Sequence, residues 1–290
     1  MKRLGTLLFE AFGKLLGILP KRVIYIFSDF LYLIGYHIIK YRKKVVFENL
    51  RNAFPEKSEK EIKSIAKRFF HHLSDVMIEN IVSLFMRPAK IKQFVSFRNI
   101  EVLTNLYNKN KNITGLIGHY GNWEFLTTIP PYTNYSVLSV YKPLKNKFFD
   151  RKTFEMREKL DAIPVPMKKV YKVISGYEKS KQPYILGMVA DQSPPKRDVN
   201  YWTTFMNQET AFFTGSEKIA RRFNHAIVFT VVHKIKRGHY EVEFTELFEN
   251  AGKTKENEIT EAYVRNLENI IREKPEHWLW SHRRWKHKRN

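Results

Sequence analysis

Short apolar runs alternate with helical patterns in the second half of the chain, and this alternation constrains the fold more than any other feature. The runs at residues 113–118, 135–141 and 184–190 are bounded by polar or turn residues, as buried strands usually are. Helical patterns at residues 146–160 and 168–179 lie between the second and third runs. Strands that alternate with helices indicate an α/β domain.

The last third of the chain adds a hairpin to this pattern. A helical stretch at residues 214–223 precedes two strand-like runs, 226–235 and 240–247, which flank a turn at Gly238. A final helix is predicted over residues 258–273. The hairpin and the crossover helices together predict a mixed β-sheet flanked by helices.

A long helix is predicted before the first strand. Ser58 and Glu61 have the spacing of a capping box, and apolar residues continue at helical intervals to about Leu84. No internal repeat or linker divides the chain from residue 45 to residue 290, so this range is predicted to be one domain.

Residues 1–44 have a different character. Apolar residues recur at three- and four-residue steps between residues 4 and 19 and again between residues 23 and 38, and a basic run follows. Asp29 and His37 are costly in hydrocarbon, which favours a helical hairpin on or partly in the membrane over a spanning helix. The alternative is that both apolar stripes pack on the core of the domain. No cleavage site of small residues follows either stretch, so a signal peptide is not predicted.

Charge and cysteine content restrict the function. The chain has 51 Lys and Arg against 29 Asp and Glu, a formal net charge of +22. Such a surface attracts anionic partners: nucleic acid, an acidic protein or a bilayer. Cysteine is absent, which excludes disulfides, thiolate metal ligands and a cysteine nucleophile.

The segment "GHYGNWE" contains the strongest candidate for chemistry. His119 and Glu124 would lie about 140° apart on an ideal helix, so they converge only if His119 precedes the helix and Glu124 lies in its first turn. A carboxylate on one imidazole nitrogen would let the other take a proton from a hydroxyl. No serine lies within the segment, which favours direct transfer to a substrate hydroxyl. The alternative is a helix-capping carboxylate beside an unrelated histidine. No third ligand for a metal site is evident.

Five segments resemble one known family. "GHYGNWE" is similar to the motif of histidine, four residues and an acidic residue in the lipid A biosynthesis (lauroyl/myristoyl) acyltransferases, a branch of the glycerolipid acyltransferase superfamily. The segments "YRKKVVFENLRNAFPE", "VYKPLKN", "ADQSPPK" and "HWLWSHRRWKHKR" resemble other motifs of this family in order and spacing. Two departures are Lys142, where many members have arginine, and "QSPP" after Asp191, where many have Asp-Tyr-Gly.

The resemblance implies a membrane-associated enzyme that moves a fatty acyl chain from acyl carrier protein to a hydroxyl of a lipid A precursor, without a cofactor or metal. It implies the cytoplasmic face of a bacterial inner membrane as its location. His119 would be the general base and Glu124 its partner. The residues that it implies for substrate binding are Arg157, Asp191, Tyr141, Lys142 and Asn122. Arg157 would stabilise developing oxyanion charge or bind a substrate phosphate.

Three alternatives remain open at this point. Basic residues from Arg283 to Arg289 interleave with Trp280 and Trp285, which is also the composition of a nucleic-acid surface, although nucleic acid is not expected under the family resemblance. A basic binding protein without catalysis, or an acyltransferase with a different aminolipid acceptor, has the same motifs. The aromatic stretch at residues 199–215 either lines an acyl channel or belongs to the core.

Overall fold

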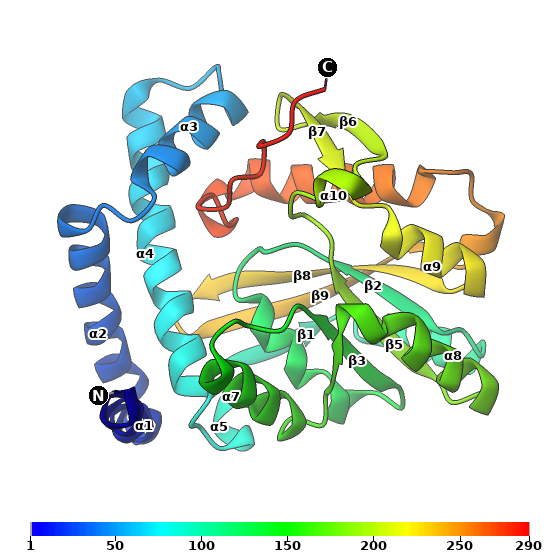
Figure 1. Ribbon diagram of the computed structural model, residues 1–290, viewed down its shortest axis with the longest axis horizontal. Coiled ribbons are helices and arrows are strands. Elements are labelled where there is room, and N and C mark those ends of the chain that lie inside the picture. Colours follow the sequence, from blue (N-terminus) through cyan, green and yellow to red (C-terminus); the bar gives the residue numbers. More distant parts are fainter. Residues whose placement is uncertain (1, 290) are drawn as a thin grey trace.

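A computed structural model describes the backbone of residues 2–289 and the side chains of residues 6–289. Its centre is a seven-stranded sheet with the order β1-β9-β8-β2-β5-β3-β4, and helices cover both faces of this sheet (Figure 1). Neighbouring strands are parallel except for the antiparallel pair of β8 and β9. The predicted α/β fold, a mixed sheet flanked by helices, is confirmed.

The elements have the following bounds. The strands of the sheet are β1 (Val95–Arg98), β2 (Ile113–Ile117), β3 (Ser136–Tyr141), β4 (Ile163–Pro166), β5 (Tyr184–Val189), β8 (Ala226–Lys236) and β9 (His239–Phe248), and β6 (Tyr201–Phe205) and β7 (Gln208–Phe212) form a separate hairpin. The α-helices are α1 (Lys2–Ile18), α2 (Lys21–Leu33), α3 (Lys43–Ala53), α4 (Glu59–Ser83), α5 (Pro88–Lys92), α6 (Glu101–Asn108), α7 (Lys147–Glu158), α8 (Val170–Ser180), α9 (Gly215–Phe223) and α10 (Glu258–Glu273).

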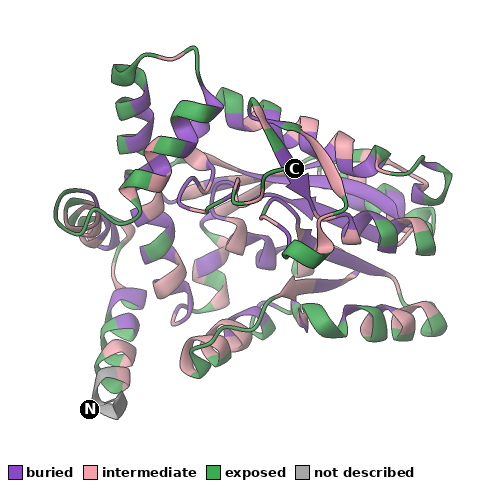
Figure 2. Ribbon diagram, turned by 45° about the horizontal axis from the view of Figure 1, so that its top comes forward, coloured by how far each residue is buried: buried purple, intermediate pink, exposed green. Residues whose placement is uncertain are grey.

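The sheet is buried on both faces because its strands alternate between two cores. Leu116 and Phe229 point to one core, which α9 and α10 complete. Ile113 and Val228 point to the other core, to which α6 and α7 contribute. Figure 2 shows the central strands buried and the outer sides of the helices exposed.

Helix α4 lies beside the turn that joins β8 and β9, where Lys234 and Tyr240 contact its carboxylates, and it begins at the predicted cap. The Ser58 hydroxyl accepts from the Glu61 backbone N–H, and the Glu61 carboxylate accepts from the Ser58 N–H, so the capping box is present. Figure 1 shows α4 between the sheet and α2. Tyr25 and Ser28 of α2 donate hydrogen bonds to carboxylates of α4.

The two N-terminal helices have a buried side and an exposed side. Leu16 and Ile24 are fully buried, so part of each stripe packs on the core. The outward residues do not: Leu8 is 63% exposed, Ile26 is 65% exposed and Phe30 is 61% exposed. The side chain of Leu4, which belongs to the predicted stripe, lies outside the described residues.

Within residues 2–289, none of the helices taken singly has the length and apolar character that a membrane span requires. The segments Lys21–Ile38 and Lys43–Ala53 reach these limits only when they are taken together, and they are bent by 86° relative to each other. The predicted membrane association of residues 1–44 therefore stays a prediction.

Part of the aromatic stretch at residues 199–215 belongs to the core. It forms the β6-β7 hairpin, in which Phe205 and Phe212 are buried and their ring centroids lie 5.4 Å apart. None of its residues lines the apolar cavity described below. Phe205 and Phe212 therefore belong to the core, and the acyl-channel interpretation of the stretch stays a prediction.

The basic C-terminal tail is folded onto the domain. Trp280 is fully buried and its Nε1 donates to the Pro275 carbonyl, while the half-buried Trp285 donates to the Thr210 hydroxyl. The Arg284 guanidinium lies over the Phe212 ring, 4.3 Å from its centroid. These rings are occupied by core contacts, so they do not offer the free stacking surface that single-stranded nucleic acid needs.

Candidate active site

The turn after β2 places His119 at the carboxyl end of the central strands. Its backbone carbonyl accepts from the Leu279 N–H at 3.1 Å, which ties it to the C-terminal tail. Gly121 has a φ of +61°, and a Cβ at this position would lie 1.9 Å from the Val232 carbonyl oxygen. Only glycine fits this close approach. His119 therefore precedes the 3₁₀ helix Trp123–Thr128, and Glu124 lies in the first turn of that helix, as predicted.

Asp191 is the carboxylate that contacts His119. Its Oδ1 lies 2.6 Å from His119 Nδ1, and its Oδ2 accepts from the His119 backbone N–H at 2.9 Å. Trp278 Nε1 donates to the same Oδ2 at 2.8 Å. Burial by itself raises the pKa of Asp191, but attraction to the His119 ring and these hydrogen bonds outweigh burial and lower the pKa to about 2. Asp191 is therefore ionised at neutral pH.

The partner on Nδ1 determines what Nε2 can do. An ionised carboxylate only accepts hydrogen bonds, so Nδ1 carries a proton, and the amide donor beside Nε2 makes Nε2 the acceptor. The Gln192 amide nitrogen lies 3.0 Å from Nε2 and donates to it. The Trp123 ring packs edge-on against the imidazole, with the centroids 4.8 Å apart. The ring is thus oriented with a basic nitrogen pointing away from Asp191.

Glu124 contacts Arg157 rather than His119. Arg157 Nη2 donates to both carboxylate oxygens of Glu124, at 3.0 Å and 2.9 Å, and no hydrogen bond joins Glu124 to His119 within residues 6–289. The guanidinium also lies 5.3 Å from the centroid of the Tyr141 ring. Arg157 Nε and Nη1 are buried and have no hydrogen-bond partner among the described residues.

The other predicted substrate-binding residues divide into two groups. Tyr141 and Lys142 lie at the carboxyl end of β3 and line the same cavity as His119. Asn122 does not line it: this side chain is fully buried, and its Nδ2 donates to Glu79 at 2.9 Å. A substrate has no access to Asn122 in this arrangement.

An apolar cavity of about 610 Å³ opens beside His119. Trp123, Tyr141 and Arg157 line it near the carboxyl ends of the strands, and Leu103 and Ile113 line it near their amino ends. From Ile113 to His119 the chain advances six residues, which is about 20 Å of strand. The volume lies within the range of small-molecule sites, and the lining suits a long hydrocarbon.

The buried carboxylate of Glu79 holds the turn that carries His119, through a hydrogen bond from Asn122. Glu79 of α4 is fully buried and accepts from the Tyr25 hydroxyl at 2.5 Å, the Tyr240 hydroxyl at 2.8 Å and the Asn122 amide. These contacts link α2, β9 and the turn that carries His119. Burial raises the pKa of Glu79 to about 7, and the three hydrogen bonds oppose this effect without cancelling it.

Glu79 should make the free energy of unfolding depend on pH. In the folded chain the carboxyl keeps its proton up to a pH of about 7, whereas in the unfolded chain it has its ordinary pKa of 4.5. Between pH 4.5 and about 7 the unfolded chain loses this proton first, so the contribution of Glu79 to stability falls as pH rises, by about 3 kcal/mol in total. Urea unfolding of wild type and Glu79→Gln over this range should show the stability of the variant rising relative to wild type. Parallel curves would contradict this assignment.

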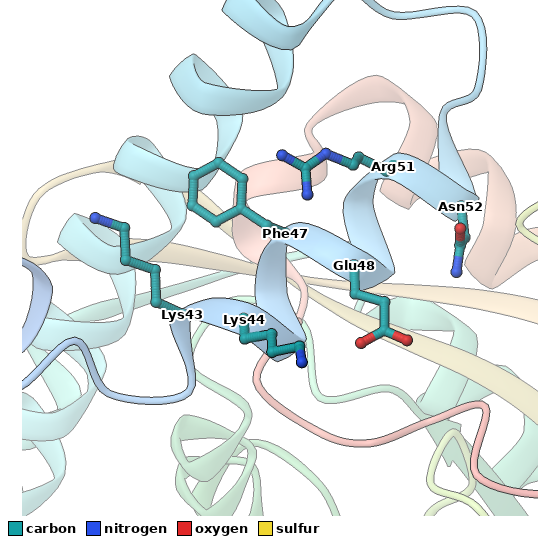
Figure 3. A pocket seen from close by; sticks show the side chains of 6 residues that line it. All are labelled: Lys43, Lys44, Phe47, Glu48, Arg51 and Asn52. Atoms are coloured by element: carbon teal, nitrogen blue, oxygen red, sulfur yellow. The ribbon is translucent and has the colours of Figure 1, made fainter.

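Two further hollows lie on α3 and the tail. One of about 430 Å³ is lined by six side chains of α3 alone (Figure 3), including Lys43, Phe47 and Arg51. Arg51 is already paired with Glu59 at 2.7 Å, and Lys43 Nζ lies over the Tyr36 ring. The other, of about 830 Å³, joins α3 to the tail. Neither contains His119, Asp191 or Arg157. Across the described part of the chain, no group of three or more His, Asp or Glu side chains is placed to hold a metal ion.

Two partners in the site were not predicted from the sequence. Asp191 was predicted to bind substrate, whereas it holds His119, and Trp278 was not singled out as its second partner. A signal for the first existed: residues 119 and 191 each follow a buried run, and the carboxyl ends of parallel strands meet at one edge of a sheet. Glu79 also had a signal: it lies three residues after Val76 and three before Val82, so the helical period places a carboxylate on the buried face of α4.

Comparisons with known proteins identify the family of this chain. The family model described as bacterial lipid A biosynthesis acyltransferase matches residues 1–287. The chain is 19% identical over 249 residues to the lipid A biosynthesis palmitoleoyltransferase of Escherichia coli (strain K12), which covers 86% of this chain and 80% of that protein. The lipid A biosynthesis acyltransferase of Shigella flexneri matches to the same extent. Because the family model spans nearly all of its length, this chain belongs to the bacterial lipid A biosynthesis acyltransferase family.

Proposed function

We propose that this protein is a membrane-associated acyltransferase that moves a fatty acyl chain from acyl carrier protein to a hydroxyl of a lipid A precursor or a related lipid. The observation that carries the proposal is the position of His119. Its Nδ1 is held by the buried, ionised Asp191, and its Nε2 is left as a base at the edge of an apolar cavity.

The reaction needs one proton transfer in each direction. The acceptor hydroxyl attacks the thioester carbonyl while His119 Nε2 takes its proton. The tetrahedral intermediate then collapses, the carbon–sulfur bond breaks, and the carrier thiolate leaves and takes the proton back from Nε2. Asp191 stays ionised and stabilises the imidazolium between the two steps. Gln192, which donates to Nε2 in the free protein, must give way to the acceptor hydroxyl.

Arg157 is proposed to stabilise the negative charge of the intermediate. Glu124 fixes one end of the guanidinium, and Nε and Nη1 are buried without a hydrogen-bond partner, so in this proposal they donate to the oxyanion after substrate binding has displaced the side chains that cover them. Buried donors that are held in advance at a developing oxyanion are worth several kcal/mol to the transition state. In this proposal Glu124 acts through Arg157. Tyr141 and Lys142, at the edge of the cavity, are placed to contact an anionic headgroup.

The test of the function is direct transfer by the purified protein. The protein in detergent would be given a long-chain acyl carrier protein thioester and a lipid A precursor, and the products would be analysed by mass spectrometry. The expected product is the precursor with one more acyl chain, together with free carrier thiol. Parallel reactions with acyl coenzyme A and with an aminolipid acceptor identify the donor and acceptor classes. If the folded protein transfers no acyl chain between any of these pairs, the function is rejected.

The same proposal places the protein at the cytoplasmic face of a bacterial inner membrane. Its support is the outward-facing apolar side chains of α1, of α2 and of the π-helical turn Ile34–Ile38 that follows α2. No other part of the described chain covers these side chains. They include Leu7, Leu8, Leu15, Ile18, Ile26, Phe30, Leu33, Ile38 and Ile39. Large exposed apolar residues that gather on one pair of helices are typical of a surface that inserts into the interface of a bilayer.

Replacing four of these residues should release the protein from membranes. Each of Leu8, Leu15, Ile26 and Phe30 contributes roughly 1 kcal/mol or more when it enters hydrocarbon. The combined change to glutamine should therefore weaken binding to anionic vesicles by more than about a hundredfold in a flotation assay. The control is Tyr171→Gln: this side chain is also about half exposed, and its helix α8 lies apart from α1 and α2 (Figure 1). Equal flotation of the two variants would show that the membrane contact lies elsewhere.

A further inference from the structure

Two glycines lie side by side on the central strands at the wall of the cavity. Gly115 of β2 is paired in register with Gly187 of β5, and both line the apolar cavity. The row continues across the sheet to Val228 on one side and Ser139 on the other, and these residues line the cavity as well. A row of two glycines between a valine and a serine thus crosses four neighbouring strands on one face.

The backbone does not require glycine at either position. Positive φ occurs among the described glycines at Gly121 and Gly238, and not in this pair. A Cβ at Gly115 would lie 3.8 Å from its nearest neighbour, Ile185 Cγ2, and a Cβ at Gly187 would lie 3.6 Å from Ile117 Cδ1. Both are ordinary van der Waals distances, so alanine fits. Glycine inside a strand weakens it, and it commonly marks a place where a ligand approaches the backbone closely.

The rows on either side carry larger side chains. Ile117 and Val189 form the next row toward His119, and Ile113 and Ile185 form the next row toward the amino ends. All four line the cavity. The glycine row is therefore a trough between two rows of larger side chains, and a ligand in the cavity can approach the strand backbone there. Gly187 is partly exposed although β5 has neighbours on both sides.

We propose that Gly115 and Gly187 form the floor of the acyl-chain site and determine which chain lengths the protein accepts. This inference rests on the proposed acyltransferase function. Gly115 lies four residues before His119, about 13 Å along the strand, so the far part of a long acyl chain whose thioester carbonyl lies beside His119 reaches this row. The ligand is an unbranched hydrocarbon chain, because the rows on both sides of the trough, Ile117 with Val189 and Ile113 with Ile185, are apolar.

The first experiment measures fatty-acid binding without catalysis. A fluorescent fatty acid would be displaced by saturated fatty acids of increasing length from wild type, Gly115→Ala, Gly187→Ala and the double variant. Short acids should bind all four proteins equally. In wild type each further methylene that enters the cavity tightens binding by about fourfold, and in the variants this gain should stop at a shorter chain. The control is Gly176→Ala on α8, where a Cβ meets no atom within 4 Å. If the affinity of the Gly115→Ala, Gly187→Ala and double variants depended on chain length in the same way as that of wild type, the proposal would be overturned.

The second experiment repeats the series with acyl carrier protein thioesters and measures kcat/KM. For Gly115→Ala, Gly187→Ala and the double variant, the ratio of kcat/KM for long donors to kcat/KM for short donors should fall below that of wild type. The fall should be about fourfold for each methylene that no longer fits. Wild type that binds fatty acids but transfers none would reject the proposed function alone, whereas transfer with an unshifted profile would reject this inference alone. Labelling wild type with a fatty acid that carries a photoreactive terminal group needs no variant. Labels should fall on residues 113–117 or 185–189, and labels that fall only elsewhere contradict the inference.

Discussion

His119→Ala should lower kcat for acyl transfer by about 10²- to 10⁴-fold, the usual contribution of a general base. The imidazole is the group whose free nitrogen faces the cavity, while Nδ1 is occupied by Asp191. Alanine removes the base and leaves the apolar lining in place, so KM for the acyl donor should change little. Steady-state kinetics with carrier-bound donor and lipid acceptor measure both constants.

A surface histidine provides the control for this variant. His71 on α4 has a half-exposed side chain and contacts Asp29 and Tyr32 rather than the cavity, so His71→Ala should keep kcat within about twofold of wild type. If His119→Ala retained kcat within about threefold, His119 would not be the base. The mechanism proposed here would then have to be abandoned.

Asp191→Asn should have an effect of similar size, about 10³- to 10⁴-fold on kcat. An asparagine amide can donate to Nδ1, which forces the proton onto Nε2 and removes the base. The corresponding change in a serine-protease triad costs about 10⁴-fold for this reason. The variant also loses the stability that the ionised carboxylate provides: the pKa of Asp191 is lowered to about 2 from 3.8, so this contribution of about 2 kcal/mol is present above pH 4 and is lost as pH falls to about 2. Circular dichroism must therefore confirm that the measured protein is folded.

Two further variants separate the roles of the carboxylates. Glu124→Gln keeps the shape of the side chain and weakens the bond to Arg157, so it should lower kcat by about tenfold to a hundredfold, less than Asp191→Asn does. Trp278→Phe removes one donor to Asp191 and keeps the ring, and it should cost about tenfold or less. If Glu124→Gln abolished activity while Asp191→Asn left it intact, Glu124 would be the partner of His119, as the sequence motif implies.

Local sequence patterns predicted the regular elements with good accuracy. The helix predicted over residues 258–273 is α10 (Glu258–Glu273), and the capping box at Ser58 starts α4 as expected. The hairpin at Gly238 is present with a φ of +75° at the glycine. These features depend on residues within about four positions of each other or on one turn residue. Local sequence patterns are therefore sufficient to predict them.

The elements that were not predicted have weak local signals. Strands β1 and β4 have four residues each, too few for an alternating pattern to stand out. The sequence predicts no element over the β6-β7 hairpin because its residues show neither clean helical nor clean strand periodicity, and its turn is formed by Met206 and Asn207, which have positive φ although neither is a glycine. For such short elements the neighbouring strand or core decides the conformation, because their own propensity is small.

The sequence by itself determined the fold class, most of the long elements, the placement of His119 before a helix and the family to which the segments point. Only the tertiary structure decided which groups meet. It set Asp191 against His119 across 72 positions, paired Glu124 with Arg157, buried Asn122 on Glu79, and laid Gly115 beside Gly187. The physical reason is that periodicity reports which face a side chain occupies, whereas the order and register of parallel strands decide what lies opposite that face.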